Sequence, residues 1–208
     1  AVICAAAAVW LAYAERLYPQ PLLRGGVRVA TLGYAVPGLV LAVALMLPMT
    51  SLDKWIATQL RDVFDIRWGL LLTGTPAALI FVYVARFLTV AFNSTEAGLT
   101  QIHPQFDAAA RSLGQSPRGV LRRVHLPLLR PAILAGLLLV FIDVMKELPA
   151  TLILRPFNFE TLATWVYRYA ADERLAEAST AALVIVLVGL VPTWLLTLSR
   201  REDERSRQ

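Results

Sequence analysis

The apolar residues of this chain fall into long blocks that alternate with short polar segments. Four blocks are candidates for membrane-spanning helices, and they cover Val29–Met49, Gly69–Phe92, Ala132–Val144 and Ala181–Leu198. A further block, Ala1–Ala14, opens the sequence and is therefore the first of the five blocks in chain order. A helix that crosses a bilayer needs ~20 apolar residues, and Ala132–Val144, the fourth block in chain order, approaches this only if it continues through Glu147. The pattern predicts an all-α membrane protein, a bundle of about five transmembrane helices.

Composition agrees with a membrane protein and excludes several other classes. The chain is 57% hydrophobic and 17% charged, whereas soluble domains are roughly half apolar and about a quarter charged. The net charge of +5 comes from basic residues that lie between the apolar blocks, without an aromatic-basic face. We therefore expect the lipid bilayer, and not nucleic acid, as a partner. The single cysteine, Cys4, allows no disulfide within the chain and is expected to be a packed thiol.

The start of the sequence bears on domain organisation. The first block begins without Met and without the basic residues of a signal peptide. It resembles a helix cut in half. We therefore expect residues 1–208 to form a single transmembrane domain of a longer chain whose N-terminal part is missing.

The basic residues predict an orientation in the membrane. Twelve lie in segments 16–28, 111–130 and 200–207, and six lie in segments 54–67 and 155–174. The side that is richer in Lys and Arg faces the cytoplasm in most membrane proteins. The rule places the loop Asp107–Pro127 and the C-terminus in the cytoplasm, and it directs the segments Leu52–Trp68 and Pro149–Glu177 outward.

The loop at residues 102–127 contains signals for two short helices. Pro104 suits the first position of a helix, residues 108–110 are three alanines that favour helix, and Gly114 suits the left-handed residue that ends it. Ser116 and Pro117 would cap and begin a second helix.

The second helix is predicted to be amphipathic and to end at Pro127. Its apolar residues are Val120, Leu121 and Val124, and its basic residues are Arg118, Arg122 and Arg123. Three interpretations stay open on these residues alone. The helices could lie on the inner leaflet, pack under the bundle, or contact another protein.

The loop resembles the EAA loop of ABC importer permeases. That motif reads Glu-Ala-Ala, three residues, Gly, nine residues, then Ile, any residue and Leu-Pro. Counting from Gly114, residues 124–127 (Val-His-Leu-Pro) are in register, and residues 109 and 110 match the two alanines. Ala108 stands at the glutamate position. Asp107 is acidic but one residue early, about 100° around the helix.

The resemblance implies a role for this loop. In the family it rests in a groove of a separate nucleotide-binding ATPase subunit and couples ATP hydrolysis to transport. ATP and Mg are expected on that partner, and no cofactor on this chain, since the sequence has no G-x-x-x-x-G-K-[ST] motif. With Ala108 in place of glutamate, docking is expected to depend on Gly114 and the apolar face of the second helix. The coupling residues carried over are Asp107, Ala108, Ala109, Ala110, Gly114, Ser116, Pro117, Val124, Leu126 and Pro127.

Three ionisable residues end the fourth block: Asp143, Lys146 and Glu147. Each charge costs ~2.5 to 3.5 kcal/mol at mid-bilayer, so they must lie near the outer interface, face protein or water, or neutralise one another. Asp143 and Lys146 have the i, i+3 spacing of an ion pair, whereas Asp143 and Glu147 at i, i+4 would repel unless a cation lay between them. A structural ion pair and a pathway or gate both remain open.

Most of the chain resembles the ferric-iron group of these permeases, and specifically the C-terminal half of a fused pair. The resemblance lies in residues 31–38, 145–163 and 171–178 together with the loop. It implies a multi-pass subunit of the bacterial inner membrane that takes ferric iron from a periplasmic binding protein by alternating access. A second permease half is implied as a partner. Related permeases carry thiamine, phosphonate or polyamine, which remain alternatives.

Other classes fit the residues less well. A secondary transporter or channel would also contain apolar helices and intramembrane charges, but it would not need a hairpin around Gly114. His103 and His125 are loop residues, expected to be solvated or capping and not ligands, so any metal site is unknown. The sequence has no G-x-S-x-G or H-E-x-x-H motif, and we do not expect an enzyme.

Overall fold

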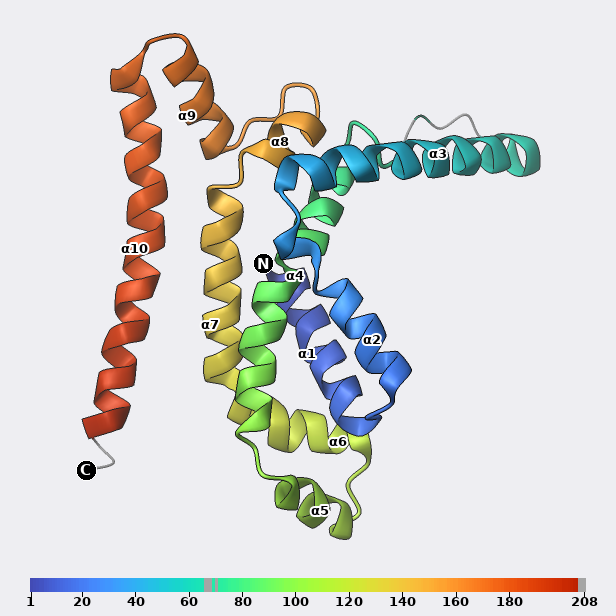
Figure 1. The fold of residues 1–208 in the computed structure, drawn as a ribbon, viewed down its shortest axis with the longest axis vertical. Helices are drawn as coiled ribbons and strands as arrows, with labels where there is room; N and C mark the ends of the chain where they lie inside the picture. The colour runs from blue at the N-terminus through green and yellow to red at the C-terminus, as the bar shows by residue number, and fades with distance from the viewer. Residues whose placement is uncertain (66–68, 70, 206–208) are drawn as a thin grey trace. The chain divides into compact units, whose positions relative to one another are not determined.

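The computed structural model describes residues 1–65, 69 and 71–205, and within these residues it contains helices and no strand (Figure 1). The ten α-helices of this described part are α1 Val2–Leu17, α2 Pro21–Ala30, α3 Gly38–Phe64, α4 Pro76–Thr100, α5 Pro104–Ser112, α6 Pro117–Val120, α7 Leu126–Met145, α8 Pro149–Leu154, α9 Leu162–Ala171 and α10 Leu175–Arg205. A 3₁₀ turn, Gly33–Ala35, precedes α3.

The predicted all-α membrane protein is confirmed. Among the described residues, three helical stretches are long and apolar enough to cross a membrane: Gly38–Val63, Pro76–Thr100 and Pro117–Met145. A shorter apolar stretch covers Leu175–Val191. α1, with 16 residues, is also apolar over most of its length.

The predicted boundaries of the second block are wrong. Val29–Met49 is not one helix, because α2 ends at Ala30 and α3 begins only after Pro37. Proline fixes its own φ and lacks an N–H, so it suits the start of a helix and not its interior. α3 then continues to Phe64, through most of the segment predicted to be an outer loop. Residues 66–68 and 70 of that segment lie outside the described residues.

Asp53 explains how a charged residue fits inside α3. Its carboxylate is buried and accepts hydrogen bonds from the backbone N–H groups of Leu71, Leu72 and Thr73, at 3.1, 2.9 and 2.6 Å. A buried carboxylate with several N–H donors is satisfied within the protein. The side chain therefore fixes the segment before α4, and α4 begins at Pro76 rather than within the apolar block that starts at Gly69.

The prediction that Pro127 ends the second hairpin helix is also wrong. The helix continues from α6 into α7, through a five-residue π-helical segment at Leu121–His125. Proline cannot donate to the carbonyl four residues earlier, and its ring clashes with that carbonyl in a regular α-helix. Widening the preceding turn, where Leu126 N–H bonds Leu121 O, lets the chain pass Pro127 without ending.

Two compact units are present, each described by itself. The first contains Ala1–Tyr34 and Phe87–Phe141, and the second contains Ala35–Arg86 and Ile142–Gln208. In the first unit, α4 and α7 approach closely at small residues. A Cβ on Gly98 would lie 2.6 Å from Ala132 Cβ, and Ser94 Oγ donates to Ala132 O at 2.8 Å. Small residues allow this kind of close packing between apolar helices.

The second unit has an apolar core where α3, α4 and α8 meet. Its buried members are Ala42, Leu79, Val82, Ala150 and Leu154. In the same unit, the short helix α9 packs against the beginning of the much longer α10, as Figure 1 shows at the orange-red end of the chain.

Candidate functional site

The first helix of the 102–127 hairpin has the caps that its sequence predicts. His103 is the N-cap, and its Nδ1 accepts from the backbone N–H of Gln105 at 3.3 Å. At the other end Gly114 has φ +77°, and the N–H groups of Gly114 and Gln115 donate to the carbonyls of Arg111 and Ala110 at 2.9 and 3.1 Å. This is a left-handed glycine that closes a helix. The prediction for Gly114 and the capping interpretation of His103 are confirmed.

The second helix starts as predicted, but its apolar face is not free. Ser116 Oγ accepts from Gly119 N–H at 3.3 Å, with Pro117 in the first turn. Val120 is fully buried, Leu121 and Val124 are half-buried, and the three arginines are exposed. The apolar face packs inside the first unit. Docking of another protein on this face stays a prediction, and the burial of Val120 leaves only Leu121 and Val124 partly accessible for it.

Asp107, in the first turn of α5, lies at the centre of a cluster of polar side chains. Its Oδ2 accepts from Arg16 Nε at 3.0 Å and from Arg16 Nη2 at 2.6 Å, and its Oδ1 pairs with His125 Nε2 at 2.5 Å. Burial acts to raise the pKa of Asp107, but the hydrogen bonds from Arg16 and His125 outweigh it and hold the pKa below its ordinary value. Asp107 is thus an ionised internal anchor of the hairpin.

The last turn of α1 reaches both hairpin helices. Besides Asp107, Arg16 donates to the carbonyl of Leu99 at 2.7 Å and to that of Ile102 at 2.9 Å, where α4 ends. The hydroxyl of Tyr13 donates to Pro117 O at 2.7 Å. We call the four side chains Tyr13, Arg16, Asp107 and His125 the Asp107 brace.

His125 corrects an expectation. The sequence suggested a solvated or capping residue, but the side chain is 0% exposed, and its ring centroid lies 5.3 Å from that of Tyr13. His125 lies in the π segment just before Pro127, where the wider turn directs it toward the Asp107 carboxylate. The residue therefore belongs to the packed interior of the hairpin and not to its surface.

The exposed side of the hairpin is formed mainly by α5. Ala108 and Ala109 are exposed, while Ala110 is buried. Two large apolar side chains lie in the same region, Phe106 at 53% and Leu113 at 80% exposure. Exposed apolar side chains around small residues form a surface that favours contact with another protein.

In the second unit, the charges after the fourth block form two separate pairs. Lys146 Nζ lies 2.9 Å from Asp143 Oδ1, which confirms the spacing argument for that pair. α7 ends at Met145, so Glu147 lies beyond the helix and the i, i+4 helical spacing assumed for Asp143 and Glu147 does not apply. Glu147 instead pairs with Arg86, whose Nε lies 3.3 Å from Glu147 Oε2.

The pair of Arg86 and Glu147 is tied to the start of α3. Arg86 Nη1 donates to Val36 O at 2.7 Å, and Glu147 Oε1 accepts from Ala150 N–H at 3.3 Å. A Cβ on Gly38 would clash with Glu147 Oε1 and lie 3.0 Å from Arg86 Nη1. Glycine lets the backbone pass close to this pair, and a larger residue at position 38 would displace the two side chains. Arg86 had no predicted partner, because the two residues are far apart in the sequence.

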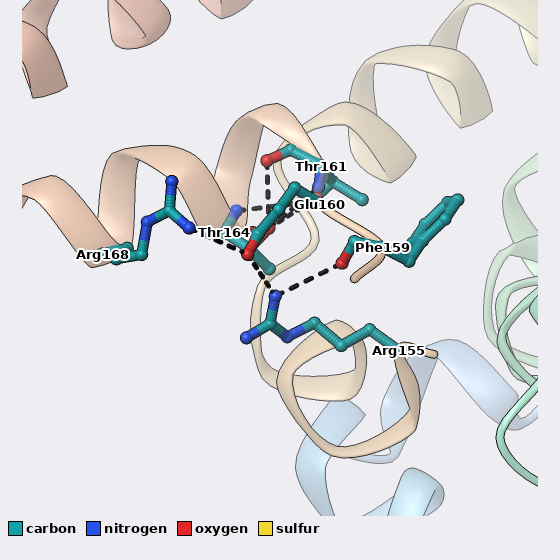
Figure 2. A network of polar contacts seen from close by, with 6 residues as sticks. All are labelled: Arg155, Phe159, Glu160, Thr161, Thr164 and Arg168. Atoms are coloured by element: carbon teal, nitrogen blue, oxygen red, sulfur yellow. Dashed lines mark hydrogen bonds and ion pairs between the residues drawn. The ribbon is translucent and has the colours of Figure 1, made fainter. Parts of the chain in front are cut away.

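A second carboxylate cluster forms between α8 and α9 (Figure 2). Glu160 Oε1 accepts from Arg155 at 2.6 Å and from Arg168 at 3.3 Å, and Oε2 accepts from Thr164 Oγ1 at 2.8 Å. Thr161 and Thr164 also cap α9 reciprocally. We call Arg155, Glu160, Thr164 and Arg168 the Glu160 cluster. It fixes the turn before α9, whose tip carries the exposed Phe157.

Metal-ligating side chains do not gather in the described part of the chain. No group of three or more His, Cys, Asp or Glu residues there is placed to hold a metal ion.

Known proteins similar to this chain are transport permeases. It is 32% identical over 195 residues to the Fe(3+)-transport system permease protein FbpB 2 of Haemophilus influenzae, a match that covers 94% of this chain and 35% of that protein. It is 28% identical over 157 residues to the ferric transport system permease protein FbpB of Actinobacillus pleuropneumoniae, covering 73% and 22%. A Salmonella typhimurium permease protein assigned to 2-aminoethylphosphonate transport, PhnV, is 34% identical over 125 residues, covering 59% and 46%.

The chain spans about a third of the length of the first of these relatives. A family profile described as binding-protein-dependent transport system inner membrane component matches residues 5–202, which is nearly the whole chain. This match shows that the chain belongs to the family of inner membrane components of binding-protein-dependent transport systems.

Proposed function

We propose that this chain is part of the membrane-spanning permease of an ABC importer, and that its 102–127 hairpin receives movement from a separate ATPase subunit. The observation that carries the proposal is the hairpin itself. It has a left-handed turn at Gly114, an exposed α5 surface, and the Asp107 brace behind that surface. An element that transmits force needs a face for its partner and a rigid attachment on the other side.

The docking surface of this proposal is the exposed side of α5, in place of the apolar face of the second helix. Ala108 leaves room where the family motif has a glutamate, and Phe106 and Leu113 offer apolar contact. Asp107 is engaged by Arg16 and His125 and does not replace the missing glutamate. Contact with the ATPase would then depend on shape and apolar area more than on charge.

The remaining partners follow from this assignment. ATP and Mg would bind the ATPase subunits, a periplasmic binding protein would deliver the substrate, and a second permease half would complete the pathway. The chain would lie in the bacterial inner membrane with the hairpin and the C-terminus in the cytoplasm, as the distribution of basic residues favours. The Glu160 cluster and Phe157 would then face the periplasm.

Ferric iron is the substrate that the comparisons favour. The permease with 94% coverage of this chain carries the name of an Fe(3+)-transport system. A second candidate is 2-aminoethylphosphonate, since PhnV matches at similar identity over a shorter stretch. Uptake of radiolabelled Fe³⁺ and of labelled 2-aminoethylphosphonate by cells that carry the complete system decides between them. Uptake of neither would contradict both.

The pathway residues are part of the proposal. Asp143 and Lys146 form a pair whose Lys146 side chain is 62% exposed, so this pair is the better candidate for a gate. Glu147 is held by Arg86 and is better placed to lock α3, α4 and α8 within the second unit. Alternating access would then move these locked elements as a block.

Gly114→Pro tests the coupling role. Proline requires φ near −65°, whereas Gly114 has φ +77° and uses its N–H to close α5. We expect the variant to insert in the membrane but to lose both the ATPase subunit on co-purification and substrate uptake. Gly74→Pro is the matched control, because Gly74 has φ +76° and, as at Gly114, an added Cβ would meet no atom within 4 Å.

The control variant should retain the ATPase subunit. Normal uptake by Gly114→Pro would contradict the coupling role. Loss of the ATPase from both variants would show that the effect is general misfolding and would leave the hairpin with no special part in docking.

A further inference from the structure

We infer that the last turn of α1 is a working part of the hairpin, in which Tyr13 and Arg16 hold α5 and α6 in one body with α1. A movement imposed on α5 would then be passed to α1 as well as to α4 and α7. The inference rests on the proposed function of the hairpin and adds a positioning role for two residues outside the family motif.

Arg16 is the first part of the connection. Its guanidinium makes four hydrogen bonds, one each to the carbonyls of Leu99 and Ile102 and two to Asp107 Oδ2, at 2.6 to 3.0 Å. The planar fork of arginine suits several acceptors at once, which a lysine ammonium on its flexible stem does not match. A single side chain of α1 thus fixes the end of α4 and the first turn of α5 relative to each other.

Tyr13 extends the connection to the second hairpin helix. Its hydroxyl donates to Pro117 O at 2.7 Å, in the first turn of α6. Its ring also packs against His125, which holds the other carboxylate oxygen of Asp107. Tyr13 and Arg16 lie three residues apart on one face of α1, so both hairpin helices are held from the same turn.

The rest of α1 is packed so that it can carry a movement. Cys4, Ala8 and Ala12 are buried at a four-residue spacing, which places them on one face of the helix. No covalent connection runs directly from α1 to the hairpin, since α2, α3 and α4 intervene in the chain. The Asp107 brace therefore provides a link that chain connectivity does not.

A distance measurement tests whether α1 and the hairpin move together. We would use the full-length chain in its assembled transporter, with Cys4→Ser and spin labels at Trp10→Cys and Gln105→Cys, both exposed. The parent should give one narrow distance that is the same without nucleotide and after trapping with ATP and vanadate. Arg16→Ala should broaden this distance in both states.

Arg24→Ala is the matched control. Arg24 also pairs with a carboxylate in the same unit, Glu15 at 3.6 Å, but among the described residues it has no hydrogen bond to the hairpin. This variant should keep the parent distance. A parent distance that shifts on trapping, or an Arg16→Ala distance as narrow as that of the parent, would overturn the inference.

Uptake separates positioning from a general loss of structure. We expect Arg16→Ala to lower uptake roughly tenfold and Tyr13→Phe, which removes a single hydrogen bond, roughly fivefold. Arg16→Lys should recover only part of the loss. Full recovery would overturn the need for the arginine fork.

The ATPase subunit distinguishes the two proposals. If the parent retains the ATPase but its label distance shifts on trapping, the inference fails and the proposed coupling role stands. If the parent does not retain the ATPase, the coupling role fails, and the inference fails with it.

Discussion

The Asp107 brace and the Glu160 cluster are built around the same chemistry but join very different parts of the chain. Asp107 accepts from Arg16, 91 positions earlier, and pairs with His125, 18 positions later. Glu160 accepts from Arg155, Thr164 and Arg168, all within eight positions. The first cluster therefore fixes separate helices relative to one another, whereas the second fixes the shape of one connection.

Both carboxylates are held ionised. Hydrogen bonds from Arg16 and His125 outweigh burial at Asp107, and hydrogen bonds from Thr164 and then Arg155 do so at Glu160, so that both pKa values lie below the ordinary range. The difference between the clusters thus lies in what each one connects and not in the state of its central group. Substitution of Asp107 should therefore affect several helices, whereas substitution of Glu160 should affect only the connection before α9.

Asp107→Ala should have the largest effect. It removes the partner of Arg16 and of the fully buried His125, and a buried polar group without a partner costs about 1 to 3 kcal/mol. We expect a lower melting temperature in detergent and a loss of most uptake. Asp107→Asn keeps the shape and some hydrogen bonding, and it should fall between Asp107→Ala and the parent. Equal melting temperatures and equal uptake for the parent and Asp107→Ala would show that the Asp107 brace contributes to neither stability nor transport.

The pH dependence of this effect has a definite sign. Because the folded pKa of Asp107 is lowered, its contribution is fully present above the unfolded value of about 3.9 and is lost as the pH falls through the folded value. The difference in melting temperature between the parent and Asp107→Asn should be constant from about pH 8 to 5 and should shrink below about pH 4. If the difference in melting temperature shrank near neutral pH instead, the pH dependence would arise from a titratable group other than Asp107.

Glu147→Ala should have the next largest effect, because it is a long-range pair like that of Asp107. It leaves Arg86 Nε without its carboxylate in a largely buried position, at a cost of about 2 kcal/mol. The double variant Arg86→Met, Glu147→Leu should recover much of this stability, since apolar residues can replace a buried pair. Thermal unfolding measures both. A double variant less stable than Glu147→Ala would show that the pair does more than fill the space.

Glu160→Gln should have a small effect that stays local. The cluster is partly exposed, and exposed ion pairs contribute about 0.2 to 1 kcal/mol. We expect faster hydrogen exchange in the first turn of α9 and an unchanged rate in α5. Faster exchange in both places would end the distinction between local and long-range clusters.

Lys146→Ala should have the smallest effect on stability. Lys146 is 62% exposed and its pair with Asp143 is an i, i+3 contact, which contributes a few tenths of a kcal/mol, roughly 0.3. Unchanged melting together with reduced uptake would support a gate at this pair. A large fall in melting temperature would instead assign Lys146 a structural role.

The same contrast explains which features could be predicted from the sequence. The helix start at Pro104, the turn at Gly114, the cap at Ser116 and the pair of Asp143 and Lys146 were all predicted and are confirmed. Each depends on residues at most five positions apart, so the local backbone rules determine it.

The features that were missed depend on residues far apart in the chain. Arg16 and Tyr13 gave no signal, since one was only a basic residue after an apolar block and the other an aromatic residue within it. In the sequence Arg86 is an isolated charge in an apolar block, and its pairing with Glu147 is a consequence of the tertiary fold. The burial of His125, which was expected to be solvated or capping, was missed for the same reason. It depends on the tertiary packing of the hairpin.

The π-helical segment at Leu121–His125 has a consequence for the geometry of the hairpin. A wide turn contains one residue more than an α-turn, and each residue of an α-helix advances the side-chain direction by about 100°. The segment thus sets the azimuth at which α6 leaves α7. Removing one residue from it would turn the whole hairpin about the helix axis, so this single extra residue determines which way the α5 surface points.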